Sequence, residues 1–126
     1  MAVDILGYKE LLKVLVEYQI TLTNRLKNEG YDQSFSIILI PLPNWNEKKL
    51  RDTVLPLLRN SDRLFYIEEN LIALLPNTDW NGAQKVHDTI VTALNLKDME
   101  DRVVEYPTDG ENAFTLISNL YAKLDN

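Results

Sequence analysis

Apolar side chains near the start of the chain recur at the spacing of a long helix. Steps of three and four residues place a set of them on one face, as the period of an α-helix requires. The set is Tyr8, Leu11, Leu15, Tyr18 and Leu22, and Leu12, Val14, Val16 and Ile20 widen it. Gly30 follows shortly afterwards and favours the end of a helix. The pattern therefore predicts a helix over residues 5–28.

A different pattern follows, a short apolar run rich in β-branched residues. Residues 35–40, FSIILI, are typical of a strand that is buried on both faces. Pro41 and Pro43 come directly after it, and proline cannot donate a hydrogen bond to a neighbouring strand. We predict that the strand ends there.

Two further runs, 63–67 and 71–75, predict a pair of adjacent strands. The short segment between them is typical of a tight hairpin turn and consists of Glu68, Glu69 and Asn70. Asparagine tolerates the left-handed conformation, so Asn70 is able to adopt it in such a turn. Residues 102–106 predict the last strand, and Tyr106 to Gly110 predict a turn after it.

Helical spacing also appears between and after these strands. Asn44 or Asn46 is expected to cap a helix that runs to about Arg59, with Pro56 breaking or kinking it. Its inward residues are predicted to be Leu50, Val54, Leu57 and Leu58. Thr78 or Asp79 is expected to cap a helix over residues 80–94, and a closing helix is predicted over 111–124. The inward residues of these two helices are Ala83, Val86, Ile90, Leu94, Ala113, Leu116, Ile117 and Leu120.

The order of elements after the first helix is β-α-β-β-α-β followed by a helix. This order predicts an α+β fold with a ferredoxin-like core, in which helices cover one face of a largely antiparallel sheet. We expect one domain over residues 1–126, made of an N-terminal helix (1–30) and a core (34–126).

Composition narrows the function classes. The chain is 45% hydrophobic and 25% charged, as in globular proteins, and it has no cysteine, which fits a cytoplasmic protein. No run is long enough to cross a membrane, so we expect no membrane insertion. The net charge of −6 disfavours nucleic acid as a partner. We interpret the local basic cluster of Lys48, Lys49 and Arg51 as a solvated helix face.

Several segments, in order, resemble the GGDEF (diguanylate cyclase) family. Residues 35–45, FSIILIPLPNW, resemble its first strand, usually fsvlliDiDhFK. Residues 59–64, RNSDRL, resemble the stretch R-x-s-D-x-v before its signature hairpin. Residues 71–78, LIALLPNT, and 106–113, YPTDGENA, resemble its strand F-a-i-l-l-P-x-t and its turn yP-x-dG-x-da. The resemblance implies a ferredoxin-like core and covers residues 35 to about 120.

The same resemblance implies that the family's chemistry is lost. Family members hold divalent cations for GTP with an Asp of the first strand and an acid of the GGDEF turn. Here the two first-strand acids are replaced by Pro41 and Pro43, which have no side-chain oxygen, and Asn44 is a weaker neutral ligand. Glu68 and Glu69 stand where glycines would let the nucleotide approach the backbone. One reading keeps Glu69 as a metal ligand; we favour an exposed acidic hairpin, with no catalytic residue, no metal and no cofactor.

Arg59 and Asp62 match the family's R-x-x-D inhibitory site, which binds the product cyclic di-GMP. The resemblance implies that these two residues form a nucleotide-binding site kept after the reaction was lost. The alternative, which we favour, is that an Arg and an Asp before a strand pair with each other or cap the chain.

The remaining candidates are weaker. His87 is the only histidine and has no second histidine at metal-binding spacing, so we expect it on a helix surface. Trp45 and Trp80 are binding anchors or, as we favour, pack over the edge of the core. The stripe Tyr8, Leu11, Leu15, Tyr18 and Leu22 either contacts another protein or a second copy, or covers the sheet; both remain open.

We therefore expect a non-enzymatic regulatory or scaffolding domain that acts through protein contacts in bacterial signalling. A cyclic di-GMP receptor is the alternative, and residual enzymatic activity is a third possibility that requires a carboxylate pair not evident in the sequence.

Overall fold

The computed structural model describes residues 4–125 of the chain and places five strands in one sheet. The strand order is β1-β3-β4-β2-β5. The strands are β1 (Ile5–Leu6), β2 (Phe35–Pro41), β3 (Arg63–Ile67), β4 (Asn70–Pro76) and β5 (Val103–Tyr106). The helices are α1 (Lys9–Asn28), α2 (Glu47–Thr53), α3 (Trp80–Ala93) and α4 (Ala113–Ala122). None of the helices in the described range has both the length and the apolar character that a bilayer span requires.

The central strands pair in the ferredoxin-like order. β2 is antiparallel to both β4 and β5, and β3 is antiparallel to β4. Phe35 of β2 lies opposite Pro76 of β4 and Tyr106 of β5, and its ring stacks on that of Tyr106 at a centroid separation of 5.0 Å. The predicted α+β class and the β-α-β-β-α-β core are confirmed.

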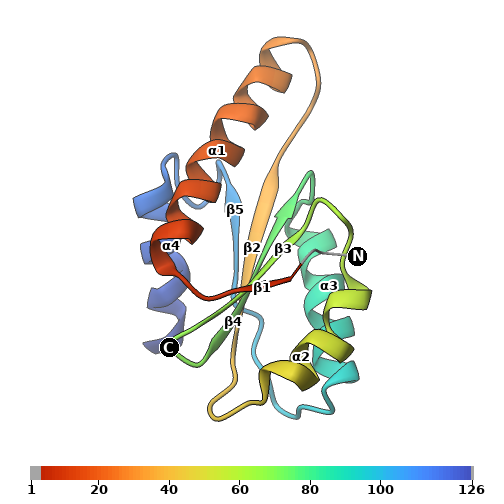
Figure 1. Ribbon diagram of the computed structural model, residues 1–126. Coiled ribbons are helices and arrows are strands. Elements are labelled where there is room, and N and C mark those ends of the chain that lie inside the picture. Colours follow the sequence, from red (N-terminus) through yellow and green to blue (C-terminus); the bar gives the residue numbers. More distant parts are fainter. Residues whose placement is uncertain (1–3, 126) are drawn as a thin grey trace.

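Helices cover both faces of the sheet, so the prediction of helices on one face is wrong for the whole chain. Figure 1 shows α1 and α4 on one side of the strands and α2 and α3 on the other. The helices between core strands return to the same face, whereas the N-terminal and C-terminal helices cover the opposite one. Both faces of the sheet are therefore shielded from water, which explains the uninterrupted burial from Phe35 to Ile40.

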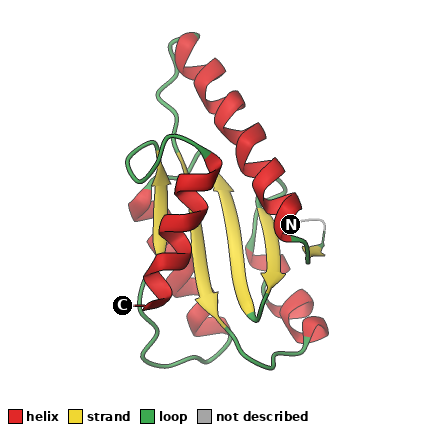
Figure 2. Ribbon diagram, turned by 90° about the vertical axis from the view of Figure 1, so that its left-hand side faces the viewer, coloured by secondary structure: helices red, strands yellow, loops and turns green. Residues whose placement is uncertain are grey.

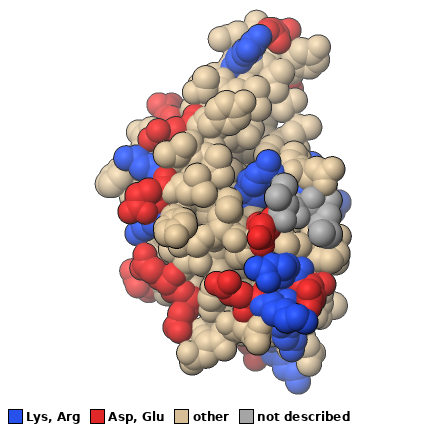
Figure 3. All heavy atoms as spheres, in the orientation of Figure 1, with Lys and Arg blue, Asp and Glu red and all other residues tan. Residues whose placement is uncertain are grey.

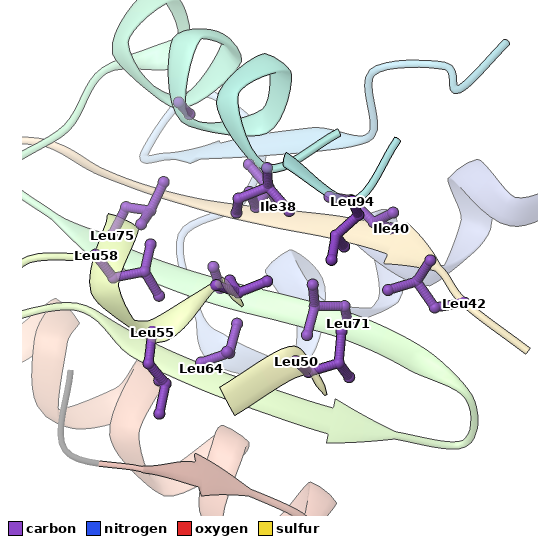
Figure 4. Packing of buried hydrophobic residues seen from close by; sticks show 14 of the residues in the cluster. Ile38, Ile40, Leu42, Leu50, Leu55, Leu58, Leu64, Leu71, Leu75 and Leu94 are labelled. Atoms are coloured by element: carbon purple, nitrogen blue, oxygen red, sulfur yellow. The ribbon is translucent and has the colours of Figure 1, made fainter. Parts of the chain in front are cut away.

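The side chains of alternate strand residues pack into two separate hydrophobic cores, one on each face of the sheet. Ile38 and Ile40 of β2 contact the core under α2 and α3, whereas Ile37 and Leu39 contact the core under α1 and α4. Figure 4 shows the first of these cores, in which Leu50 of α2 and the later Leu55 and Leu58 pack with leucines of the sheet. Burial of apolar side chains on both faces is the main source of the fold's stability.

The first helix begins four residues later than predicted. Residues 5 and 6 are not helical but form β1, which pairs in parallel with Leu64 and Phe65 of β3. The predicted end is confirmed, because Gly30 adopts a left-handed φ of 96° and its amide donates to the Lys27 carbonyl. Figure 2 shows the far end of α1 extending beyond the sheet.

The second helix is shorter than predicted. Asn46 caps α2 by accepting hydrogen bonds from the amides of Lys48 and Lys49, and the helix ends at Thr53 rather than near Arg59. A 3-10 turn, Leu55–Leu57, follows, with Pro56 inside it. Leu57 is 41% exposed, so its predicted inward position is wrong. Proline cannot continue the i to i−4 hydrogen bonds, which accounts for the change of helix type.

The last two helices lie close to their predicted positions. Asp79 caps α3 through the Gly82 amide, and Asn112 caps α4 through the Thr115 amide. Ala113, Leu116, Ile117 and Leu120 are buried as predicted. His87 is an exception: it is buried within α3, so the expected surface position is wrong.

Candidate functional site

The carboxyl end of β2 is the first region to consider, because the predicted loss of metal ligands lies there. Pro41 is the last residue of β2 and lies opposite Asn70 of β4, and Pro43 is exposed in the loop beyond. Between them, the Leu42 amide donates to the Glu69 carbonyl at 2.8 Å. Neither proline brings a side-chain oxygen to this strand end, so β2 itself offers a cation none of the carboxylates that it prefers.

The β3–β4 hairpin faces the same end of the sheet. Its turn consists of Glu68 and Glu69, with φ of 52° and 63°. Asn70, which is able to adopt a left-handed conformation, does not do so here; its side-chain amide donates to the Glu68 carbonyl. A two-residue turn with two positive φ values matches the right-handed twist of the strands, although it usually contains Asn and Gly. Both glutamates are exposed, in agreement with an acidic hairpin.

Tyr66 ties the loop after β2 to the hairpin. Its hydroxyl donates to the Leu42 carbonyl and accepts a hydrogen bond from the Trp45 amide at 3.4 Å. Trp45 packs against the core beside Tyr66, as favoured from the sequence, and the Lys49 ammonium lies 5.1 Å from the centre of its indole ring. The strand end is thus held by side chains that have no metal-binding chemistry.

The Lys9 side chain of α1 links the β3–β4 hairpin to α4. The Lys9 ammonium lies 3.9 Å from Glu68 and 4.7 Å from the centre of the Tyr121 ring. Partial burial is the larger cause that raises the pKa of Tyr121, and the negative charge of Glu68 raises it further. The Glu68 carboxylate of the hairpin therefore already has an ion-pair partner, Lys9, within the protein.

Arg59 and Asp62 lie at the opposite end of β3, directly before the strand begins. The Asp62 carboxylate is buried and accepts from both the backbone amide and Nη2 of Arg59, each at 2.8 Å. The same Nη2 donates to the Pro76 carbonyl at 2.7 Å and to the Thr78 hydroxyl at 2.9 Å. The pair therefore anchors the start of β3 to the end of β4, which supports the structural reading favoured above.

Arg59 also borders a polar groove of about 730 Å³, and its side chain is 53% exposed. Lys27 is the second cation of this groove, whereas Asp79 and Glu105 contribute acids that occupy the start of α3. Asp79 accepts from the Gly82 amide, and Glu105 accepts from the Trp80 amide at 2.6 Å. The helix amides that would attract an anion are thus already bound by carboxylates.

Three solved structures have the same arrangement of elements. The isolated GGDEF domain of TpbB (YfiN) from Pseudomonas aeruginosa has a TM-score of 0.70 at 14% identity, covering 97% of this chain and 86% of that one. A sensory box/GGDEF family protein from Caulobacter crescentus has a TM-score of 0.64 at 18% identity, covering 97% and 95%. A DGC protein from Thermotoga maritima has a TM-score of 0.65 at 15% identity, covering 94% and 94%.

The chain has the fold of a GGDEF domain. No protein-family model and no curated protein matches its sequence. The resemblance read from short sequence segments is therefore confirmed at the level of the GGDEF fold, and the carboxyl end of β2 and the hairpin turn lie together in it.

The predicted α1 stripe lies to one side of the row that covers the sheet. Within α1 the buried residues are Leu12, Val16, Gln19 and Thr23. Tyr8 and Tyr18 of the stripe are 72% and 64% exposed, whereas Leu11, Leu15 and Leu22 are half-buried. The stripe is therefore divided: Leu11 and Leu15 pack against the core under α1 and α4, whereas Tyr18 and Tyr8, the residue before α1, are exposed.

The basic side chains Lys48 and Arg51 of α2 form ion pairs within the protein. Lys48 pairs with Asp52 at 3.4 Å, and Arg51 pairs with Asp4 at 3.1 Å. A hydrogen bond from the Ile5 amide lowers the pKa of Asp4 most, and the bond from Arg51 lowers it further. In the orientation of Figure 1, the basic spheres near α2 in Figure 3 are interspersed with acidic ones, as expected for a solvated face.

One group of polar side chains was missed from the sequence. Asp101 lies in the loop before β5 and approaches His87 and Asp88 of α3. No motif spacing links a loop residue to a helix residue, and only the docking of α3 beside β5 brings them together.

Proposed function

We propose that this chain is a non-enzymatic regulatory or scaffolding domain built on the GGDEF fold, and that it acts through protein contacts in bacterial signalling. The observation that carries the proposal is the carboxyl end of β2, where Pro41 and Pro43 provide no side-chain oxygen. Metal-assisted attack on a triphosphate requires cations that bridge the phosphates and activate the attacking hydroxyl. β2 itself therefore offers those cations no carboxylate.

The hairpin adds a second obstacle to nucleotide chemistry. Glu68 and Glu69 place negative charge and side-chain bulk at the turn, whereas glycines would leave the backbone open. The hydrogen bonds of Tyr66 hold the neighbouring loop in place without any metal ion. Polyanionic GTP is therefore disfavoured by charge as well as by missing ligands.

Turnover of GTP to cyclic di-GMP tests this proposal. The untagged chain is incubated with GTP and either Mg²⁺ or Mn²⁺, and the products are separated by chromatography beside an active GGDEF domain. We expect no product above the buffer control. Product formation that disappears in Glu69→Gln but persists in Glu111→Gln, a control on the surface before α4, would overturn the proposal.

The exposed aromatic side chains of the α1 stripe, Tyr8 and Tyr18, form the surface that we propose for protein contacts, beginning with self-association. Aromatic side chains are favoured where proteins bind one another. Sedimentation velocity over a range of concentrations tests this part. We expect association in the wild type, loss in Tyr18→Ser and retention in Phe114→Ser, a similarly exposed aromatic on α4. A monomer at every concentration contradicts self-association.

The second candidate function is a cyclic di-GMP receptor that uses Arg59 and Asp62. The observation in its favour is that the half-exposed Arg59 guanidinium borders the polar groove together with Lys27. Arginine can bind a phosphate or a guanine edge through two hydrogen bonds. To bind, the ligand would have to compete with the acceptors that Arg59 already has.

Calorimetric titration with cyclic di-GMP tests the receptor. Saturable heat in the wild type and in Arg51→Ala, but not in Arg59→Ala, would support it, because Arg51 is an exposed arginine remote from the groove. Absence of heat at high ligand concentration would end this candidate.

A further inference from the structure

A buried histidine and two aspartates form a compact group beside α3. The Nδ1 atom of His87 lies 3.1 Å from Oδ1 of Asp88 and 3.0 Å from Oδ1 of Asp101. The three potential ligand atoms all lie within 4.8 Å of one another. His87 is 1% exposed, whereas the side chains of Asp88 and Asp101 are 67% and 29% exposed. The group thus has a fixed interior ligand and an opening to solvent.

The positions of these side chains follow from the docking of α3. His87 lies one turn from Ala83 and Ile90, which are buried in the core, so its ring is fixed by packing. Its Nδ1 edge is directed toward the loop before β5, where Asp101 is located. Gln84, one turn earlier on α3, donates from Nε2 to the second oxygen of Asp101. That hydrogen bond leaves Oδ1 directed at His87, as second ligand shells do in metal sites.

The charge of the group is unbalanced. Among the described residues, no Lys or Arg lies within ion-pair distance of Asp88 or Asp101; their shared partner is the His87 ring. Nδ1 can carry one proton, which two carboxylates would have to share. Two carboxylates beside one imidazole, with no Lys or Arg among the described residues at ion-pair distance, favour binding of a cation.

We propose that His87, Asp88 and Asp101 bind a divalent transition-metal ion of the zinc class. Imidazole nitrogen and carboxylate oxygen are ligands that such ions prefer, with bonds of about 2.0–2.2 Å. Tetrahedral ligands at such bond lengths lie roughly 3.3–3.6 Å apart. The separations of 3.0 and 3.1 Å are those of hydrogen bonds, so a bound ion would move each carboxylate a few tenths of an ångström away from the ring. Water completes the coordination on the exposed side of Asp88.

The environment of the second ring nitrogen, Nε2, favours neither the metal-bound nor the metal-free state of His87. Nε2 of His87 is buried and has no hydrogen-bond partner among the described residues. It is an unpaired acceptor when Nδ1 carries the proton and an unpaired donor when Nδ1 binds a metal. The site is independent of the lost catalytic ligands, because α3 and the loop before β5 provide it and neither β2 nor the hairpin contributes.

Zinc titration into the untagged full chain at neutral pH tests the proposal by calorimetry. We expect one Zn²⁺ per chain and weaker binding of Mg²⁺, which does not favour imidazole. Asp88→Asn and Asp101→Asn should each weaken Zn²⁺ binding by about tenfold or more. Asp52→Asn, an exposed carboxylate that pairs with Lys48, should leave it unchanged.

The single histidine gives a second measurement. Because the chain has one histidine, its imidazole nitrogen NMR signals report this site alone. Zinc should shift the Nδ1 signal more than the Nε2 signal in the wild type. Asp88→Asn changes an exposed residue and is expected to fold. No saturable binding at millimolar Zn²⁺, or wild-type affinity retained in Asp88→Asn and in Asp101→Asn, would overturn the proposal and identify a hydrogen-bonded imidazole instead.

Discussion

The two ends of β3 differ in the polar side chains that surround them. At the carboxyl end, beside the end of β2, side-chain oxygens are absent from Pro41 and Pro43, and Tyr66 organises the loop. At the amino end, Arg59 and Asp62 are both present but bind each other. One region lacks the ligands, whereas the other retains charged groups and uses them to connect strands.

This difference shows that a residue pair can be present in the sequence without being available to bind a ligand. Arg59 and Asp62 satisfy a two-letter pattern, yet three acceptors already share Nη2 of Arg59. A buried carboxylate must be compensated by hydrogen bonds, and this requirement alone explains why an arginine lies beside Asp62. Stability measurements can therefore separate the structural role of the pair from a ligand-binding role.

The largest expected effect is at the amino end of β3. Asp62→Ala removes the acceptor for the Arg59 amide and guanidinium, and we expect it to lower the free energy of unfolding by about 2–3 kcal/mol. Chemical denaturation measures this loss. Asp52→Ala is the matched control, since its exposed pair with Lys48 should contribute about 0.5 kcal/mol or less. Equal, small losses would show that the pair has no structural role.

At the carboxyl end, Tyr66→Phe should have a smaller effect. The variant keeps the ring but removes the hydroxyl that bonds Leu42 and Trp45, so we expect a loss of about 1 kcal/mol. Denaturation of the variant, with hydrogen exchange at the Trp45 amide, measures it. Unchanged exchange at that amide would contradict the bridging role of Tyr66.

The hairpin turn predicts a stabilising substitution. Glu69 has a φ of 63°, which costs a non-glycine residue about 1–2 kcal/mol. Allowing for the greater chain entropy of glycine, Glu69→Gly should raise the free energy of unfolding by about 0.5–1 kcal/mol. Glu10→Gly within α1 should lower it by about 1 kcal/mol. A loss of stability in Glu69→Gly would show that the glutamate side chain compensates for its backbone.

The smallest effect is expected at Tyr121, whose hydroxyl is buried without a partner among the described residues. Tyr121→Phe should change stability by about 0.5 kcal/mol or less at neutral pH. Burial, and then Glu68, raises the pKa of Tyr121 above 10.0, so the folded state holds its proton longer than the unfolded state. The stabilisation from Tyr121 is therefore present below pH 10 and is lost as pH rises through the raised pKa.

Denaturation at alkaline pH measures this difference. The wild type should lose stability faster than Tyr121→Phe once the pH exceeds 10. Parallel curves for the two proteins would contradict the raised pKa.

Much of the fold could be predicted because its signals are local. The β-branched run before Pro41 and the capping residues Asn46 and Asp79 define their elements within a few positions. The pairing of Ile5 with Leu64 has no local signal, since the partner strand is far along the chain. Tertiary pairing likewise forces Glu68 and Glu69, rather than Asn70, into the turn.

The candidate sites were less predictable for the same reason. The absence of side-chain oxygens at Pro41 and Pro43 is a property of the residues themselves and can be read directly from the sequence. Whether Arg59 is available depends on Pro76 and Thr78, which only the sheet brings close. The burial of His87 and its contact with Asp101 depend on how α3 docks.

Nucleotide binding at the carboxyl end of β2 is the measurement that separates a non-enzymatic domain from one that binds GTP. GTP with Mg²⁺ is titrated into the chain while backbone amide NMR signals of Leu42, Trp45 and Asn70 are followed. Because Pro41 and Pro43 have no side-chain oxygen, we expect that these signals do not shift in a saturable manner. Saturable shifts at all three amides that require Mg²⁺ would show a metal–nucleotide site at this strand end, and would contradict the proposed function.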